Sequence, residues 1–128
     1  MTNLVTQVRA ALADRDAIEL ALLFGSRARG DARPDSDLDV AVLGRSLDRL
    51  DLADRIARAT GLEPQVVDLA SAGIPLLRRL VREGIVVREA RPGTYASWRT
   101  RAWLAIETDG PAVDAMRDAF LARLAGGR

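Results

Sequence analysis

The sequence predicts a small α/β (or α+β) domain, in which helices pack on a small mixed sheet and a helical segment follows at the C-terminal end. Short apolar runs typical of buried strands alternate with segments whose apolar residues recur at helical spacing. Clusters of Gly, Pro, Asp and Ser separate these segments, as turns do. The length of 128 residues is that of one domain. We therefore expect a single domain over residues 1–128.

The first half of the chain predicts a helix and two strands. In order, these are a helix over about residues 4–12, a buried strand over 18–24, a turn-rich segment over 25–35 and a strand over about 36–43. Thr2 or Asn3 is available as the N-cap of the helix, because either side chain can accept a hydrogen bond from a free backbone amide.

The second half predicts two more strands, each preceded by a helix, and then a long helical stripe. In order, these are a helix over about 46–60, a strand over 63–69, a helix over 71–83, a strand over 85–88 and the stripe over 95–124. Ser46 and Ser71 are the expected N-caps of the two helices, and Pro75 suits a first helical turn. Because the Asp-Gly-Pro sequence at 109–111 interrupts the stripe, we expect two helices or one kinked helix there.

The composition excludes several kinds of catalytic site. The chain has neither Cys nor His, which removes zinc sites, thiol nucleophiles and catalytic triads that use imidazole. All nineteen basic residues are Arg, so no Lys is available for a Walker-type phosphate loop or a Schiff base. Catalysis would have to use carboxylates, hydroxyls, backbone amides, Arg and bound metal.

Charge and apolar pattern limit the partners. The formal net charge is +1, which predicts no strong direct binding of nucleic acid. The longest apolar run, residues 20–24, is far too short to cross a bilayer, and the N-terminus lacks a basic region followed by an apolar core. We expect a cytoplasmic protein without a membrane-spanning segment.

Two aspartates at the start of the second strand form a candidate metal site. Asp37 and Asp39 are two residues apart, so both side chains project from one face of the strand. Two carboxylates held side by side repel each other unless they share a cation. Hard oxygen ligands on a rigid strand suit Mg²⁺, with room for phosphate oxygens and water.

Gly25 and Ser26, which we call the Gly25 turn, form a candidate anion-binding site after the first strand. Gly lets the backbone approach an anion closely, and free amides at the start of a helical turn point toward it. The Ser26 hydroxyl adds another donor. A strand–loop–strand thus places an anion site beside the acid pair. Arg27 and Arg29 either contact phosphate or lie on the surface.

The spacing of Gly-Ser, ten residues and Asp-x-Asp resembles the signature of the DNA-polymerase-β-like nucleotidyltransferase superfamily. Residues 24–30 (Phe-Gly-Ser-Arg-Ala-Arg-Gly) and 36–42 (Ser-Asp-Leu-Asp-Val-Ala-Val) look especially like its minimal nucleotidyltransferase (MNT) branch. The resemblance implies a polymerase-β-like fold, with a catalytic unit over about residues 17–70 and C-terminal helices over about 94–125.

The resemblance also implies roles for the matching residues. Gly25 and Ser26 would bind the β- and γ-phosphates of ATP, and Asp37 and Asp39 would ligate two Mg²⁺ ions. A third family carboxylate comes from a neighbouring strand. Asp68 is the candidate for this metal ligand, and for help in removing the acceptor's proton, because apolar strand residues flank it. The alternative is that Asp68 caps the turn after its strand.

Stand-alone MNT proteins are similar to antitoxins encoded beside a HEPN-family ribonuclease toxin. In that family the antitoxin transfers AMP from ATP to a tyrosine of its toxin, which implies a HEPN-type partner in a hetero-oligomer. The apolar stripe over 95–124 would offer a partner surface. Two alternatives stay open. One is an enzyme that modifies a small molecule such as an antibiotic, and the other is a non-catalytic antitoxin that acts by binding alone.

Overall fold

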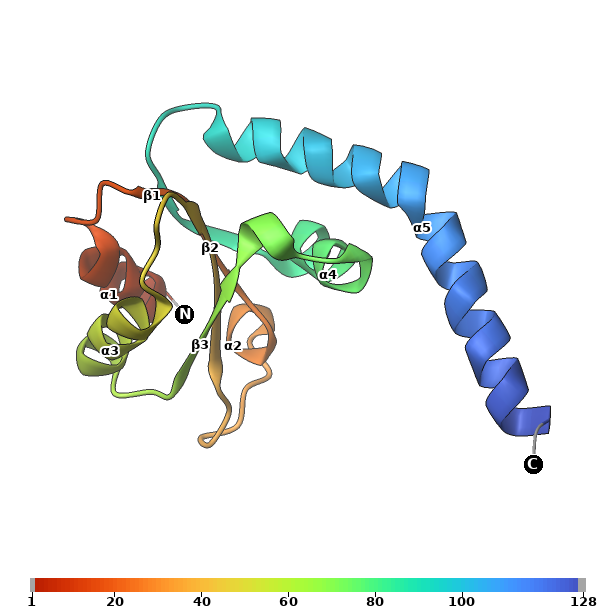
Figure 1. The fold of residues 1–128 in the computed structure, drawn as a ribbon. Helices are drawn as coiled ribbons and strands as arrows, with labels where there is room; N and C mark the ends of the chain where they lie inside the picture. Colours follow the sequence, from red (N-terminus) through yellow and green to blue (C-terminus); the bar gives the residue numbers. More distant parts are fainter. Residues whose placement is uncertain (1, 127–128) are drawn as a thin grey trace.

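A four-stranded mixed sheet forms the centre of the protein (Figure 1), whose computed structural model describes residues 2–126. The strands are β1 (Ile18–Phe24), β2 (Leu38–Gly44), β3 (Pro64–Asp68) and β4 (Ile85–Glu89). They lie in the order β3-β2-β1-β4, with β1 antiparallel to both neighbours and β3 parallel to β2. The predicted mixed sheet and its four predicted strands are confirmed.

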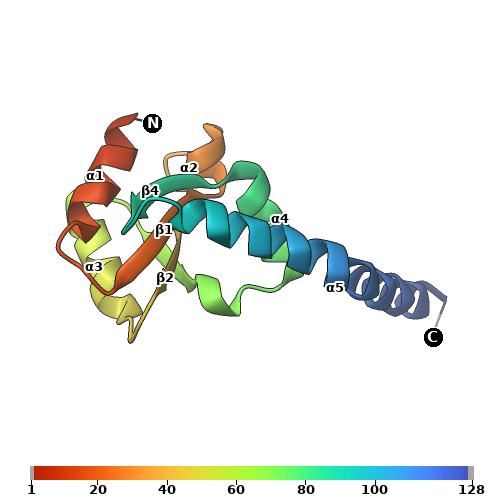
Figure 2. The same cartoon turned by 90° about the horizontal axis from the view of Figure 1, so that it is seen from above.

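Helices cover both faces of the sheet. They are α1 (Thr2–Leu12), the short α2 (Ser26–Arg29), α3 (Arg49–Thr60), the 3-10 turn η1 (Leu69–Ser71), α4 (Ile74–Glu83) and α5 (Thr94–Gly126). α1 and α3 pack on one face, whereas α4 and the first half of α5 pack on the other (Figures 1 and 2). The molecule therefore has three layers, helix–sheet–helix.

β1 is buried on both sides because it lies inside the sheet and between the two helical layers. Ala21 and Leu23 belong to the core under α1 and α3, whereas Leu20, Leu22 and Phe24 belong to the core under α4 and α5. A strand covered on both faces needs apolar residues at successive positions instead of alternate ones. This explains the continuous apolar run that predicted the strand.

The predicted N-caps of three helices are wrong, beginning with Thr2 and Asn3, both of which already belong to α1. α3 begins at Arg49, and its cap is Asp48, whose carboxylate accepts a hydrogen bond of 3.1 Å from the Asp51 amide. An Asp cap also complements the helix dipole. Ser46 stays in the preceding loop with a φ of 49°. α4 is capped by Gly73, because the expected cap Ser71 lies in η1, where its hydroxyl donates to the Asp68 carbonyl at 3.2 Å.

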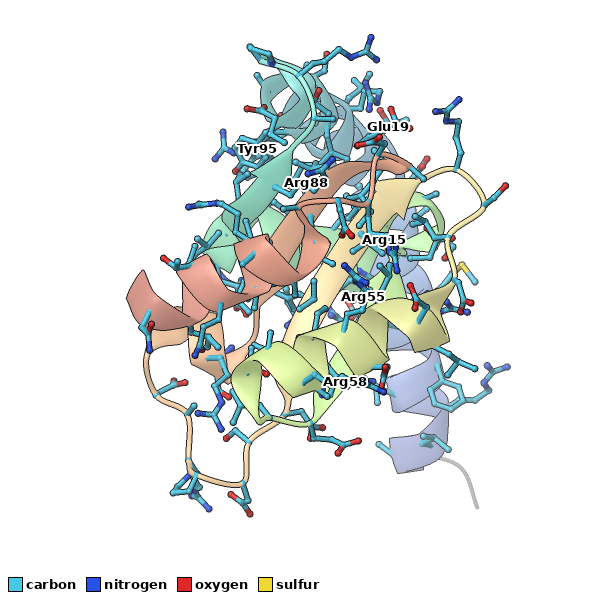
Figure 3. All side chains as sticks on the ribbon, turned by 90° about the vertical axis from the view of Figure 1, so that its left-hand side faces the viewer. Arg15, Glu19, Arg55, Arg58, Arg88 and Tyr95 are labelled. Atoms are coloured by element: carbon cyan, nitrogen blue, oxygen red, sulfur yellow. The ribbon has the colours of Figure 1, made fainter. Side chains whose placement is uncertain are left out.

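Arginine side chains tie the end of α1 to distant elements. Arg55 of α3 donates through Nε to the Ala11 carbonyl at 3.1 Å, and Arg88 of β4 donates to the Ala13 carbonyl at 3.3 Å (Figure 3). The last carbonyls of a helix have no partner within the helix, so such donors satisfy them. These bonds hold α1 against α3 and the edge strand β4.

α5 is one helix that continues through Pro111 and changes direction near its middle (Figure 1). This confirms the kinked-helix alternative, since an internal proline removes a backbone donor and bends a helix. The buried residues of α5 all lie in its first half, namely Trp98, Ala102, Ile106 and Gly110. Its second half extends away from the sheet (Figures 1 and 2). Within residues 2–126, no helix combines the length and apolarity needed to traverse a membrane.

Candidate active site

The antiparallel pairing of β1 with β2 brings the Gly25 turn against the acid pair. Phe24, the last residue of β1, is paired with Asp39, so Gly25 follows directly beside this carboxylate. Gly25 has φ 78° and ψ −163°, a conformation that essentially only glycine adopts. A Cβ at position 25 would lie 2.2 Å from Asp39 Oδ2. Both the backbone conformation and the space therefore require glycine.

Asp37 and Asp39 lie close enough to influence each other. Asp37 is exposed, whereas Asp39 is half-buried. Burial raises the pKa of the Asp39 carboxyl above its usual value; the charge of Arg79 opposes this rise, and the charge of Asp37 adds to it. Weaker contributions come from Glu83, which raises the pKa of Asp39, and from Arg29, which lowers it. The negative charge on Asp39 is therefore held in unfavourable surroundings.

Asp68 is not brought to this pair, which corrects the expectation that it is a third metal ligand. In the parallel pairing of β2 with β3, Asp68 lies opposite Val42, three residues beyond Asp39 and thus about 10 Å along the strand. Because side chains alternate between faces, Asp68 also points to the opposite face of the sheet from Asp39. Its carboxylate accepts from the Ala70 amide at 3.0 Å, so Asp68 caps the following turn, the alternative left open above.

The β3 residue in register with Asp39 is Gln65, whose side chain shares the face of Asp39 and is exposed. A neutral amide thus stands at the position from which a β3 carboxylate would reach the acid pair. Among residues 2–126, no three or more His, Cys, Asp or Glu side chains are grouped in a way that could hold a metal. The site therefore offers the carboxylates of Asp37 and Asp39 and the side-chain amide of Gln65 beside them.

The amide of Gly25 does not stand free for an anion. It donates a 2.6 Å hydrogen bond to Oε2 of Glu83, the last residue of α4. The two neighbouring arginines also make contacts within the protein. Arg27 donates to the carbonyls of Pro34 and Ser36 at 3.2 and 3.0 Å, which holds the loop that leads to Asp37. Arg29 pairs with Glu83 and with the exposed Asp31.

Comparison with known proteins identifies the family. Residues 6–92, well over half of the chain, match the family described as polymerase beta, nucleotidyltransferase. The chain belongs to the polymerase-β nucleotidyltransferase family. The matched region contains the Gly25 turn, Asp37 and Asp39, so the site described above coincides with the part of the chain that carries the family likeness.

The chain is similar to proteins of toxin–antitoxin systems. The chain is 35% identical over 71 residues to the protein adenylyltransferase MntA of Shewanella oneidensis; this match covers 52% of the chain and about half, 51%, of that relative's length. A toxin–antitoxin crystal structure with AMP-PNP has a similar chain, with a TM-score of 0.74 and 25% identity, over 95% of this chain and 98% of the other.

A second solved structure has the same fold at lower identity. It is a chain of the complex between a tri-AMPylated S. oneidensis HEPN toxin and its MNT antitoxin, with a TM-score of 0.68 and 22% identity. The likeness covers 96% of this chain and 97% of the other, so it extends into α5.

The sequence interpretation of the candidate site missed two residues, Glu83 and Arg79, both on α4. Glu83 could have been noticed, since an acid at the C-terminal end of a helix opposes the helix dipole and therefore needs another reason to be there. Arg79 gave no such signal, because an Arg in the second half of a surface helix is usual. The register of β4 had to be known before either residue could be placed.

The contact of Gly25 with Asp39 predicts different costs for two glycine substitutions. Gly25→Ala should lower the free energy of unfolding by roughly 3 kcal/mol or more, because strain and a clash add together. Gly30→Ala is the control: Gly30 also has a positive φ, 85°, but its added Cβ meets nothing within 4 Å. It should lose only about 1 kcal/mol. Urea denaturation followed by circular dichroism measures both, and equal losses would contradict the described packing.

The raised pKa of Asp39 predicts that Asp39→Asn stabilises the folded protein without divalent cations. A carboxyl whose pKa is raised on folding destabilises the fold as pH rises through its unfolded value near about 4, and the penalty persists at neutral pH. The free energies of unfolding of variant and wild type should therefore agree at acidic pH, while the variant's is higher at pH 7. Asp35→Asn, which changes an exposed acid in the loop before β2, should alter the stability little. A less stable Asp39→Asn variant at pH 7 would refute the assignment.

Proposed function

We propose that this protein is a Mg²⁺-dependent protein adenylyltransferase and antitoxin, which transfers AMP from ATP to a hydroxyl group of a HEPN-type toxin. The acceptor that we assign is the hydroxyl of a tyrosine. The observation that carries the proposal is the contact of the Asp39 carboxylate with the Gly25 turn, with Asp37 on the same side. It unites a candidate metal site and a candidate phosphate site. The relative named an adenylyltransferase and the relatives solved with AMP-PNP or an AMPylated toxin support the choice of reaction.

Different residues of the site would bind the metal and the phosphates. Asp37 and Asp39 would hold Mg²⁺, since paired oxygen ligands at the start of a rigid strand suit this ion and their mutual repulsion favours a shared cation. When bound, the metal supplies charge neutralisation at the triphosphate and lowers the pKa of the acceptor hydroxyl. Ser26 offers its hydroxyl to a phosphate oxygen. Asp68, on the other face of the sheet, takes no part in removing the proton.

The second half of α5 is the proposed docking surface for the toxin. Its residues are exposed from position 115 to 126, and four large apolar side chains lie there at helical spacing, namely Met116, Phe120, Leu121 and Leu124. An exposed apolar stripe of this kind marks an interaction surface. The occupant we assign is the toxin, because relatives solved in toxin–antitoxin complexes are similar over nearly the whole chain, α5 included.

The catalytic assignment predicts that Asp37→Asn and Asp39→Asn each lower AMP transfer at least about 100-fold, because each removes charge stabilisation at the reacting phosphate. The measurement is transfer of label from ATP to a HEPN-type toxin, sought first in the gene beside that of this chain. Asp35→Asn is the matched control and should retain activity. Chelation of divalent cations should abolish transfer by the wild type.

The same assay separates the alternatives. Label on a small hydroxyl compound, but not on the toxin, would favour an enzyme that modifies small molecules. Tight toxin binding without any labelled product would favour an antitoxin that acts by binding alone. Full transfer by either Asn variant, or transfer in the presence of chelator, would reject the metal assignment.

The docking assignment predicts that Phe120→Asp weakens toxin binding at least about tenfold, because it places a charge in an apolar contact. Leu50→Asp is the control: Leu50 is 85% exposed but lies on α3, far along the chain from α5. It should bind like the wild type in calorimetry with the purified toxin. Unchanged toxin binding by Phe120→Asp would show that this face binds something other than the toxin. The same conclusion would follow if the substitution abolished association between copies of this chain and left toxin binding unchanged.

A further inference from the structure

α4 ends with an acid whose side chain is largely enclosed and lies in an unfavourable place. Glu83 is the last residue of the helix, and its side chain is only 8% exposed. The C-terminal end of a helix carries partial negative charge, so a carboxylate there is destabilising, and burial adds a desolvation cost. Such a side chain persists only where specific partners compensate for both costs.

The partners of Glu83 are the parts of the candidate active site that surround Asp39. Its Oε2 accepts from the Gly25 amide at 2.6 Å, and both of its oxygens accept from Arg29 Nη1, at 3.3 and 3.1 Å. Arg79 lies one helical turn before Glu83, with its Nη2 3.8 Å from Oε2. Glu83 therefore joins α4 to the backbone of the Gly25 turn and to Arg29, the last residue of α2.

Sheet pairing explains why Glu83 meets this turn. β1 and β4 are antiparallel, with Leu23 opposite Ile85. Extending this pairing by two residues along each chain places Gly25 opposite Glu83. The sheet pairing therefore brings the end of α4 beside the Gly25 turn, where the Glu83 side chain reaches the Gly25 amide. Arg79 is also held in place, because its guanidinium lies over the Phe24 ring at 5.3 Å from the centroid.

We propose that Glu83 is a positioning residue, which fixes the Gly25 turn and Arg29 beside Asp39 and thereby prepares the site for the triphosphate. This inference rests on the proposed nucleotide transfer. It also reassigns the Gly25 amide, which serves Glu83 and not the nucleotide. Phosphate binding is then left to Ser26 and to the guanidiniums of Arg29 and Arg79. Each guanidinium has more N–H donors than its contact with Glu83 uses.

A competing reading is that Glu83 occupies the phosphate site until ATP displaces it. Displacement would require a side chain that is more than nine-tenths buried to leave a backbone amide and two guanidiniums together. A charge-assisted hydrogen bond of 2.6 Å is among the stronger kinds in a protein. The two readings predict opposite changes in nucleotide affinity when the carboxylate is removed, because a placeholder would compete with ATP whereas a positioning residue assists it.

Three variants test the inference. Glu83→Ala removes the acceptor and the charge, whereas Glu83→Gln keeps an acceptor for the Gly25 amide and loses the ion pairs. Asp114→Ala is the matched control, because it breaks a comparable ion pair between α4 and α5 that lies outside the candidate site. In this pair Arg78 donates two hydrogen bonds to Asp114, of 2.8 and 3.0 Å. Amide hydrogen exchange by NMR should show the Gly25 N–H protected in the wild type and in Glu83→Gln, but not in Glu83→Ala.

Nucleotide affinity is the second measurement, with AMP-PNP and Mg²⁺ as the probe and calorimetry as the method. Loss of a hydrogen bond to a charged group corresponds to about a tenfold change in an equilibrium constant, so Glu83→Ala should raise the Kd about tenfold and Glu83→Gln about threefold. Asp114→Ala should stay within about twofold of the wild type, as expected for a site with no shared partners. Unchanged or tighter binding by Glu83→Ala would overturn the inference, and so would an unprotected Gly25 amide in the wild type.

These outcomes are distinct from failure of the proposed function. If the wild type binds no AMP-PNP, the nucleotide proposal fails, whereas the exchange of the Gly25 amide still reports the contact with Glu83. If the wild type binds and Glu83→Ala binds equally well, only the positioning inference fails. Should Glu83→Ala not fold, Glu83→Gln still decides, because a Kd equal to or below that of the wild type contradicts the inference.

Discussion

The antiparallel pairing of β1 and β2 is the constraint on which the site depends. It places the glycine after β1 against the carboxylate of Asp39, with no space for a side chain between them. The result is a half-buried acid with a raised pKa, a charge that the folded protein alone does not neutralise. An unfavourable charge of this kind is typical of functional sites, where stability is lost for the sake of ligand binding.

Both faces of the sheet bury an apolar core, but only one of them carries the candidate site. The α1 and α3 face is an apolar core, reinforced by arginine bonds to helix-end carbonyls. Asp39 projects to the other face, where α4 brings Glu83 and Arg79 to the site and α5 continues beyond the sheet. The candidate active site and the proposed toxin surface therefore lie on the same side of the molecule. This arrangement suits an enzyme whose acceptor is another protein.

Local patterns predicted much of the fold and part of the site. The strands were readable because apolar runs and bounding glycines are local features. Gly25, Asp37 and Asp39 were also readable, since one turn and one strand place them. The caps at Ser46 and Ser71 were wrong because nearby residues competed for the same helix ends, and the closer Asp48 or Gly73 was used. Such competition depends on where the helix docks.

The sequence by itself determined the family fold, the paired aspartates and the glycine turn, because each follows from residue types at short spacing. Only the tertiary structure decided that Asp68 faces away, that Gln65 stands beside Asp39 and that Glu83 holds the Gly25 amide. The physical reason is register. A shift of one residue in strand pairing turns every side chain to the opposite face, and the sequence of one strand does not state its partner's register.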